Sequence, residues 1–423
     1  MHIAIDGHSL GILGGIERVV CNLASAMVQR GHQVTIFISE PLPKKPIYTF
    51  DEQVRFIIYT HGGRQKYIER FRRQILSCAP DICISPAADR RHFPWCAALW
   101  NSGIPFIVSE HSTPEDVESR IWNRSERLAV MAAADAIHVL RASCLPSLPE
   151  DLRVRAHVIP NAVMLPSLQR VHKNHCTIIS MGRLDRDKQN HLLVEAFASL
   201  SPDFPQWRLE IWGTGPDQWR LKKQVRQLGM KDRVRICGLT TEPEKCYATA
   251  DVVCHPSRHE AFPNTVIESM SAGIPVVGFA SCPGVNELVR HGETGLLAPE
   301  MTSTSLAQAL RTLLQNATLR KKMGDKSREL AVAYAPHVVY DAWERLLETT
   351  KSHQGKTRLR DEVCCTQSPS KVVDQRIQLL KQYVERPNVL VGEGNLLRNL
   401  IFSSPKFVRI LHPIYTWLKA NFQ

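Results

Sequence analysis

The stretch DVVCHPSRHEAFPNTVIESMSAGIPVVGFA, residues 251–280, is the clearest guide to the fold of this chain. It contains an apolar strand at 251–257, a loop, a helix that begins at Pro263, and a second apolar strand at 274–280. Two buried strands joined by a helix form a crossover unit, in which both strands run parallel in one sheet. We therefore expect an α/β protein built on parallel sheets.

The same alternation of strands and helices continues on both sides of this stretch. The first half of the chain has further apolar segments of strand character at 2–6, 33–39, 81–85, 104–110 and 136–140. The second half has others at 176–184, 207–215, 234–239 and 294–300. Two such series predict two Rossmann-like, doubly wound domains that face each other across a cleft, with ligands at the carboxyl ends of the strands.

Domain boundaries are expected where this alternation stops. An aperiodic stretch predicts a linker at 166–175, between an N-terminal Rossmann-like domain at 1–165 and a C-terminal Rossmann-like domain at 176–335. A helix at 336–350 is expected to return to the N-terminal domain, and residues 351–423 form a basic C-terminal extension. That extension has 12 Lys and Arg and 5 Asp and Glu, so it carries 12 − 5 = +7 of the net charge of +12. The excess is local, which disfavours a nucleic-acid groove on the folded domains.

Cysteine usage and hydropathy indicate the cellular compartment in which the protein is expected. The 12 cysteines show no C-x-x-C spacing, so they indicate neither a zinc site nor a disulfide framework. The first ten residues, MHIAIDGHSL, enter a strand directly and do not resemble a signal peptide. No apolar run approaches the roughly 20 residues that a membrane-spanning helix needs. We expect a cytoplasmic protein.

The segment HEAFPNTVIE, residues 259–268, places two glutamates eight positions apart around a proline. Proline is favoured at the first position of a helix, so Pro263 predicts a helix over 263–273. Glu260 then lies in the preceding loop beside the free N–H groups of the first turn, and Glu268 lies two turns further along a polar face. Carboxylates so far apart suit the two ends of an extended ligand rich in hydroxyl groups, such as a sugar and a ribose.

A second charged motif, MGRLDRDK at 181–188, follows the strand that opens the second domain. The guanidinium fork of Arg183 and the compact charge of Lys188 suit a diphosphate and a leaving nucleotide. Asp185 and Asp187, between them, are typical of a solvated turn. The competing interpretation of the whole motif is a charged surface turn.

Two glycine-rich loops are less specific. GILGGIERV at 11–19 follows the first strand and enters a helix, but neither it nor GTGPDQ at 213–218 has the G-x-G-x-x-G spacing of a dinucleotide site. Gly14 and Gly15 permit a close backbone approach to a phosphate or sugar. A plain turn between strand and helix is the alternative.

Together these motifs resemble the retaining nucleotide-sugar glycosyltransferases of family 4, which have the GT-B fold of two facing Rossmann-like domains. The resemblance runs from residue 1 to about 350 and is strongest at 176–299. It is carried by GGIERV, VIPNAV, GRLDRDK, WGTGPD, SRHEAFPNTVIESMSAGIPVV and GVNELVRHGETGLL. The pair of glutamates with R-x4-K in this order is specific, whereas GGIE alone is not.

The resemblance implies that the N-terminal domain at 1–165 is the acceptor domain and the C-terminal domain at 176–335 the nucleotide-sugar donor domain. It also implies a role for each matching residue. Arg183 and Lys188 would hold the donor diphosphate, Glu260 would contact the transferred sugar, and Glu268 would bind the ribose. The remaining donor-binding positions are the loop residues Ala261, Phe262, Pro263 and Asn264 and the glycines Gly14 and Gly15. The motif SEHS at 109–112 occupies the place of a family histidine motif near the reaction centre, which makes His111 a further catalytic candidate.

Two positions depart from the family pattern, with EAFP in place of the usual EGFP and IPNAV in place of IPNGV. The methyl group of Ala261 disfavours a positive φ, so the loop or the donor sugar is expected to differ slightly. The resemblance also implies retention through front-face departure and attack. No metal cluster such as D-x-D stands out at a suitable strand end, so no metal and no cofactor is expected, with Arg183 and Lys188 taking the place of a cation.

The sequence thus predicts a hexosyltransferase that moves a sugar from a nucleotide donor to a glycan or polyprenyl-linked acceptor. The family resemblance implies that the nucleotide is UDP. Cell-surface polysaccharide, lipopolysaccharide or capsule biosynthesis is the expected setting, with N-acetylhexosamine, galactose and glucose as alternative sugars. A catalytically silent GT-B scaffold and a carbohydrate hydrolase are the competing functions. The basic segment at 64–73 and the extension predict a peripheral position on an anionic membrane, against the alternatives of a solvated helix face and an ordinary terminal helix.

Overall fold

The structure is a computed structural model that describes residues 1–8, 10, 14–42, 47–59, 64–87, 92–100, 102–121, 124–163, 171 and 174–352. Within these ranges the side chains of residues 8, 64–67, 120 and 121 are not described. Most of the predicted linker at 166–175 and all but the first two residues of the predicted extension at 351–423 lie outside the described residues.

The N-terminal half is built on a parallel sheet of strand order β3-β2-β1-β4-β5-β6-β7. Its strands are β1 His2–His8, β2 Gln33–Ile38, β3 Arg55–Ile58, β4 Ile82–Ala87, β5 Phe106–Glu110, β6 Ala136–Val139 and β7 Ala156–Val158. Every predicted strand of this half is present. The edge strands β3 and β7 were not predicted, because four and three partly exposed residues leave too short a pattern to recognise.

The C-terminal half is built on a second parallel sheet of strand order β10-β9-β8-β11-β12-β13. Its strands are β8 Cys176–Met181, β9 Trp207–Trp212, β10 Val234–Gly238, β11 Val252–His255, β12 Val276–Phe279 and β13 Gly295–Ala298. In both sheets the first strand lies in the middle and the fourth pairs with it on the side away from the second. The strand order therefore reverses between β1 and β4 and between β8 and β11, which is where doubly wound sheets bind ligands.

Helices cover both sheets. In the N-terminal half they are α1 Gly15–Gln29, α2 Arg64–Cys78, α3 His92–Leu99, α4 Pro114–Asp116, the π-helix Val117–Ile121, α5 Arg124–Ala133, the 3₁₀ turn Ala142–Ser147 and α6 Glu150–Arg153. In the C-terminal half they are the 3₁₀ turn Arg186–Lys188, α7 Asn190–Leu200, α8 Gln218–Gln227, α9 Pro243–Thr249, α10 Asn264–Ser271, α11 Pro283–Leu288, α12 Ser303–Leu314, α13 Ala317–Ala331 and the 3₁₀ turn Val332–Tyr334. None of the helices in the described ranges is long and apolar enough to cross a membrane.

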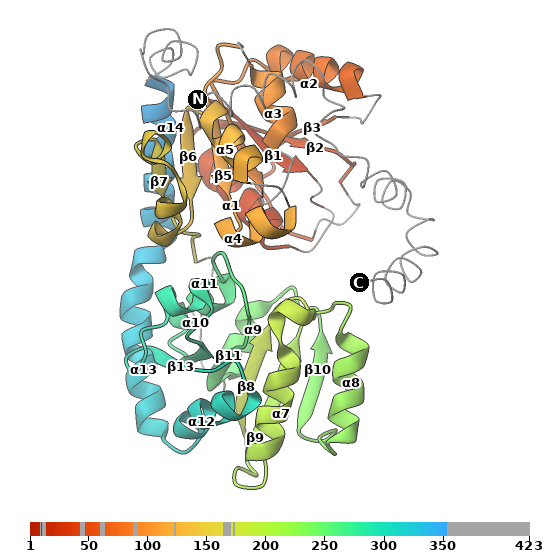
Figure 1. Ribbon diagram of the computed structural model, residues 1–423, viewed down its shortest axis with the longest axis vertical. Coiled ribbons are helices and arrows are strands. Elements are labelled where there is room, and N and C mark those ends of the chain that lie inside the picture. Colours follow the sequence, from red (N-terminus) through yellow and green to blue (C-terminus); the bar gives the residue numbers. More distant parts are fainter. Residues whose placement is uncertain are drawn as a thin grey trace.

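The last described helix, α14 Pro336–Ser352, joins the two halves. Figure 1 shows it rising from the C-terminal half to lie beside β6 and β7 of the N-terminal half. Its buried residues Tyr340, Trp343 and Leu347 belong to the same apolar core as β1 and α1. The Trp343 ring on this packed face lies 4.5 Å from the ring of His138 on β6.

The helix of the opening stretch differs from its predicted limits. It runs from Asn264 to Ser271, and Pro263 precedes it in an extended conformation with φ −75° and ψ 101°. Gly273, with φ +68°, ends the turn after the helix. Glu268, predicted on a polar face, is only 4% exposed, because that face packs against polar groups of other elements.

Candidate active site

The carboxyl ends of β8 and β11 lie side by side, since the two strands pair directly. The segment after β8 carries Lys188, and the loop after β11 carries Glu260. Lys188 Nζ and Glu260 Oε1 form an ion pair between residues 72 positions apart in the sequence. The Nε2 atom of His255, the last residue of β11, lies 2.7 Å from the same oxygen. The strand order thus brings two predicted residues together, with His255 as a partner that the motifs did not identify.

Glu260 is a largely buried carboxylate that is held in its ionised form. Its side chain is 11% exposed, and burial by itself would raise its pKa. The Lys188 ammonium and the His255 ring outweigh burial and hold the pKa of Glu260 well below its ordinary value. An ionised carboxylate only accepts hydrogen bonds, so this group is suited to donors such as the hydroxyls of a sugar.

Asp185 positions Lys188. This finding corrects the prediction that Asp185 is a solvated turn residue. Its side chain is 12% exposed and its carboxylate accepts hydrogen bonds of 3.1 Å from the backbone N–H groups of Asp187 and Lys188. These two bonds cap the 3₁₀ turn Arg186–Lys188. The turn aims the lysine at Glu260, so the acidic residue inside the basic motif is part of its structure.

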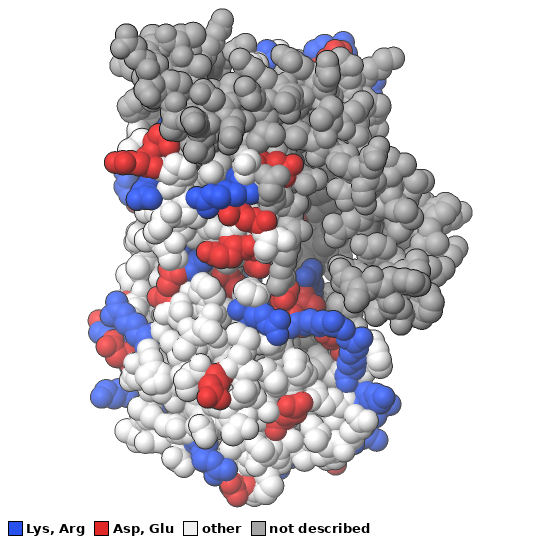
Figure 2. Space-filling model, in the orientation of Figure 1, with Lys and Arg blue, Asp and Glu red and all other residues white. Residues whose placement is uncertain are grey.

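The structure does not bring Arg183 to Glu260. The Arg183 side chain is 72% exposed, and its Nε lies 2.5 Å from Asp185 Oδ2. The two predicted cations therefore share Asp185 as a neighbour, but only Lys188 is enclosed. On the face shown in Figure 2, Lys and Arg side chains form a band along the edge of the C-terminal half nearest to the N-terminal half.

Glu268 on α10 is held by one residue from each half of the molecule. Its Oε2 accepts a hydrogen bond of 2.8 Å from the Tyr247 hydroxyl of α9. Its Oε1 lies 2.6 Å from an Nη of Arg18 on α1. Arg18 belongs to the GGIERV motif but had no assigned role, and Tyr247 belongs to no motif. The tertiary structure alone identifies these two partners.

The loop between the two glutamates is packed into the domain. Phe262 is 8% exposed, Ala261 is half-buried against the core of the C-terminal half, and Asn264 Oδ1 accepts a hydrogen bond of 2.9 Å from Asn161. Asn161 comes from the IPNAV motif of the N-terminal half. A Cβ on Gly284, in the GVNEL motif, would lie 2.5 Å from the Glu260 carbonyl oxygen. Only glycine leaves room there, so this residue sets how closely α11 approaches Glu260.

The two glycines at the start of α1 differ in what surrounds them. Gly14 precedes the helix, and its carbonyl accepts a hydrogen bond of 2.9 Å from the Tyr48 hydroxyl. Gly15 is exposed, and apart from its chain neighbours and the adjacent backbone of its own helix, no atom of the described residues lies within 4 Å of the position its Cβ would take. The backbone at Gly15 is therefore the more accessible of the two to a ligand.

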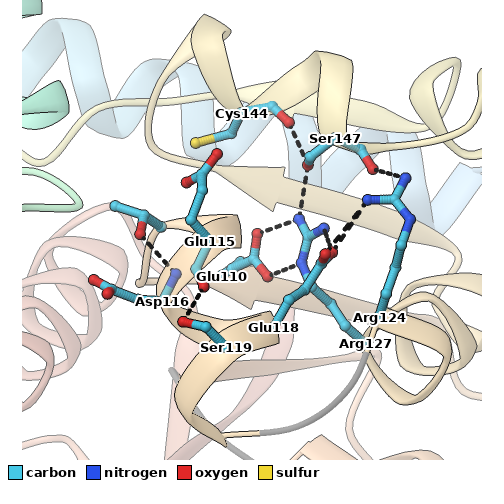
Figure 3. Close-up of polar contacts among 10 residues, drawn as sticks. Glu110, Glu115, Asp116, Glu118, Ser119, Arg124, Arg127, Cys144 and Ser147 are labelled. Carbon is cyan, nitrogen blue, oxygen red and sulfur yellow. Dashed lines mark hydrogen bonds and ion pairs between the residues drawn. The ribbon is translucent and has the colours of Figure 1, made fainter.

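His111 follows β5 directly and is 9% exposed. Its Nε2 lies 2.8 Å from Ser109 Oγ, and its backbone N–H donates to the Ala87 carbonyl. Glu110, between Ser109 and His111 in the sequence, accepts two hydrogen bonds of 2.6 and 2.7 Å from the buried guanidinium of Arg127. Figure 3 shows this pair within a network that extends to Glu118 and Ser147. Glu110 is therefore a structural anchor for the strand end that carries His111.

Three polar contacts join the two halves close to these motifs. A fourth contact lies beside one of them: the pairs are Arg18 with Glu268, Asn161 with Asn264, and Arg141 with Glu287, and the Ser143 hydroxyl also donates to Glu287. In each pair the C-terminal partner belongs to α10 or α11, the helices that flank Glu260. The site is consequently assembled from both halves.

Two sequence families match this chain. Residues 169–330 match the family described as glycosyl transferases group 1, and residues 13–165 match glycosyltransferase family 4. These two segments correspond to the two sheets. The chain therefore belongs to the glycosyltransferases.

Individual relatives and solved structures agree with this assignment. An uncharacterized glycosyltransferase of Haemophilus influenzae is 27% identical over 348 residues, which are 80% of this chain and 98% of the relative. The Campylobacter jejuni GalNAc-alpha-(1->4)-GalNAc-alpha-(1->3)-diNAcBac-PP-undecaprenol alpha-1,4-N-acetyl-D-galactosaminyltransferase is 24% identical over 80% of this chain and 96% of its own. The crystal structure of Anabaena HepE in complex with UDP and glucose matches with a TM-score of 0.68 at 18% identity, over 83% of this chain and 99% of that one. The fold is GT-B, as the sequence predicts.

Proposed function

We propose that this glycosyltransferase is a retaining hexosyltransferase that uses a UDP-sugar and acts on a glycan or a polyprenyl-diphosphate-linked acceptor in surface polysaccharide or lipopolysaccharide biosynthesis. The observation that carries the proposal is the contact between Lys188 and Glu260 at the point where the second sheet reverses its strand order. Support for the donor comes from the complex of HepE with UDP and glucose, and support for the acceptor from the undecaprenol-linked substrate in the name of the Campylobacter enzyme.

Each charged group has a part in binding the donor. Lys188 turns from Glu260 toward the diphosphate, and Arg183 supplies a second cation from its exposed position. Glu260 then accepts hydrogen bonds from the hydroxyls of the sugar, next to the first turn of α10. Glu268 takes the ribose hydroxyls through Oε1, in exchange for Arg18, while Tyr247 keeps Oε2 in place.

The transfer step breaks the bond between the anomeric carbon and the diphosphate oxygen. The acceptor hydroxyl adds to the same face of that carbon, and its proton passes to the departing phosphate. Lys188 and Arg183 stabilise the charge that develops on the diphosphate. These two cations thereby take the place of a metal ion. Closure of the two halves excludes water and limits hydrolysis of the donor.

A screen of nucleotide sugars tests this proposal. Purified protein is incubated with UDP-, GDP- and ADP-sugars, and release of nucleotide and free sugar is followed with and without candidate acceptors. We expect slow hydrolysis of one UDP-sugar, an axial anomeric configuration retained in the transfer product, and loss of turnover in the Glu260→Gln and Arg183→Met variants. Sugar release from a glycan without any nucleotide donor would instead identify a hydrolase, and unchanged turnover in both variants would contradict the assigned roles.

We also propose a peripheral position on the inner face of the cytoplasmic membrane, where a polyprenyl-linked acceptor is found. In the basic segment 64–73, Arg72 donates two hydrogen bonds of 2.6 Å to the Ala98 and Trp100 carbonyls, so this arginine is a structural residue. Membrane binding is therefore assigned mainly to the extension. Flotation with anionic liposomes should recover the full chain and less of a version that ends at Ser352. Equal recovery would rule out a contribution from the extension.

A further inference from the structure

A line of three hydrogen bonds leads through the N-terminal half to His111. The Ile159 carbonyl oxygen lies 2.7 Å from His138 Nε2, and His138 Nδ1 lies 2.7 Å from Ser109 Oγ. Ser109 Oγ in turn lies 2.8 Å from His111 Nε2. Ser109 and His138 are almost fully buried. Ser109 begins the SEHS motif but had no assigned role, and no motif pointed to His138.

Only one arrangement of protons satisfies this line when His138 is neutral. A carbonyl oxygen only accepts, so His138 Nε2 carries a proton and donates it to Ile159. The Nδ1 atom of a neutral ring is then an acceptor, and the Ser109 hydroxyl must donate to it. The remaining lone pairs of Ser109 Oγ accept, so His111 Nε2 carries a proton and donates to Ser109.

The surroundings of His138 keep its ring neutral. It packs against the Trp343 ring of α14 at 4.5 Å and lies 5.8 Å from the His111 ring. Burial, with a smaller contribution from the nearby His157 on β7, lowers the pKa of His138 to about 4, against the opposing effect of the hydrogen bond to Ile159. His138 Nδ1 is consequently an acceptor throughout the physiological pH range.

The consequence for His111 is that its two ring nitrogens have different tasks. Nε2 donates to Ser109 whether the ring is neutral or charged, so a change of protonation at His111 takes place at Nδ1. We propose that Ser109 and His138 are positioning residues that hold His111 in its Nε2–H tautomer, and that His111 acts in sugar transfer through Nδ1. The kinetic part of this inference rests on the proposed function, whereas the tautomer does not.

Nitrogen NMR of the full chain labelled with ¹⁵N-histidine tests the tautomer directly. The His111 and His138 signals are identified by their loss in the His111→Gln and His138→Asn variants. We expect both rings to be Nε2–H tautomers in the unaltered protein. In His138→Phe, the Ser109 hydroxyl loses its acceptor and turns to donate to His111 Nε2, so His111 should change to the Nδ1–H tautomer. An Nδ1–H tautomer in the unaltered protein, or no change in His138→Phe, would overturn the inference.

Kinetics of the Ser109→Ala variant test the consequence for the reaction. Turnover with the donor found in the screen should fall roughly 10- to 100-fold, because the tautomer of His111 is no longer fixed. The donor KM should stay within about twofold. Ser109→Thr keeps the hydroxyl, so its turnover should stay close to that of the unaltered protein. If threonine does not fit, His138→Asn is the second such variant, because its Oδ1 still accepts from the Ser109 hydroxyl. Unchanged kcat in Ser109→Ala overturns the positioning role, whereas absence of activity in the unaltered protein overturns the proposed function and leaves the NMR result standing.

Discussion

Two buried carboxylates, Glu260 in the C-terminal half and Glu110 in the N-terminal half, are paired with cations in different ways. Glu260 has the flexible ammonium of Lys188, and the two side chains are 11% and 24% exposed. Glu110 has the bidentate fork of Arg127, with exposures of 2% and 0%. A lysine can turn toward an arriving phosphate, whereas a buried arginine with four hydrogen bonds cannot. The first pair is thus suited to ligand exchange and the second to holding a strand end.

The largest expected effect on stability comes from breaking the second pair. Arg127→Met leaves the Glu110 charge buried without its partner, which should lower the free energy of unfolding by about 3–5 kcal/mol. Urea denaturation followed by circular dichroism measures this change. Arg124→Met is the matched control on the same helix, because that side chain is 54% exposed and its loss should cost at most about 0.5 kcal/mol. Equal losses in the two variants would contradict a structural role specific to Arg127.

The largest expected effect on activity comes from the first pair. Lys188→Met should lower turnover of the nucleotide sugar by roughly 10²- to 10³-fold, because the developing charge on the diphosphate loses its enclosed cation. The free energy of unfolding should also fall, by about 1–3 kcal/mol, since Glu260 keeps only His255 as a partner. Arg183→Met separates the two effects: it should reduce turnover but change stability by less than about 0.5 kcal/mol. A large loss of stability in Arg183→Met would disagree with its exposed position.

The ionised state of Glu260 makes a prediction about pH. Because the folded protein holds the pKa of Glu260 below its unfolded value, its stabilising contribution is complete above about pH 4.5 and is lost as the pH falls below that. The unfolding free energy of the unaltered protein should therefore decline more steeply than that of Glu260→Gln between pH 4.5 and 3. The expected difference in slope approaches about 1.4 kcal/mol per pH unit. Parallel curves for the two proteins would show that Glu260 is not held ionised.

The smallest expected effect concerns the bridge between the halves at Glu268. Arg18 is 25% exposed and glutamine keeps a hydrogen-bond donor for the buried Glu268, so Arg18→Gln should reduce stability by only about 1 kcal/mol. If the ribose displaces Arg18 from Glu268, removal of this competitor should strengthen UDP binding by roughly two- to fivefold. Isothermal titration calorimetry with UDP measures the change. The control is Arg30→Gln, at the C-terminal cap of the same helix, where the arginine pairs with Asp341 of α14. Weaker UDP binding in Arg18→Gln would mean that Arg18 assists the nucleotide instead of competing with it.

Local patterns were sufficient to predict most of the architecture. Apolar runs separated by helical segments predicted the strands of both sheets except β3 and β7, and proline and glycine placed the ends of α10 within a few residues. The signals in these cases are local, since burial on both faces makes a parallel strand apolar throughout. The short edge strands β3 and β7 could not be predicted in this way, because they are partly exposed and lack that signal.

The partners of the site residues could not be found in the same way. His255, Tyr247 and Arg18 contact the two motif glutamates from three different elements. A histidine at a strand end or a tyrosine in a helix has no spacing that marks it as a partner of a distant carboxylate. Asp185 was assigned wrongly for a related reason, because a capping aspartate and a solvated one look alike in sequence.

The sequence by itself determined the fold class, the family motifs and the identity of the two glutamates and two cations, because each depends on residue type and spacing along the chain. Only the tertiary structure showed that Lys188 is enclosed with Glu260 while Arg183 is exposed, and that Arg18 reaches Glu268 from the other half. These properties depend on which strand ends lie side by side and on how the two halves meet. Burial then determines which charges are paired, which are open to a ligand, and which proton arrangement a line of hydrogen bonds allows.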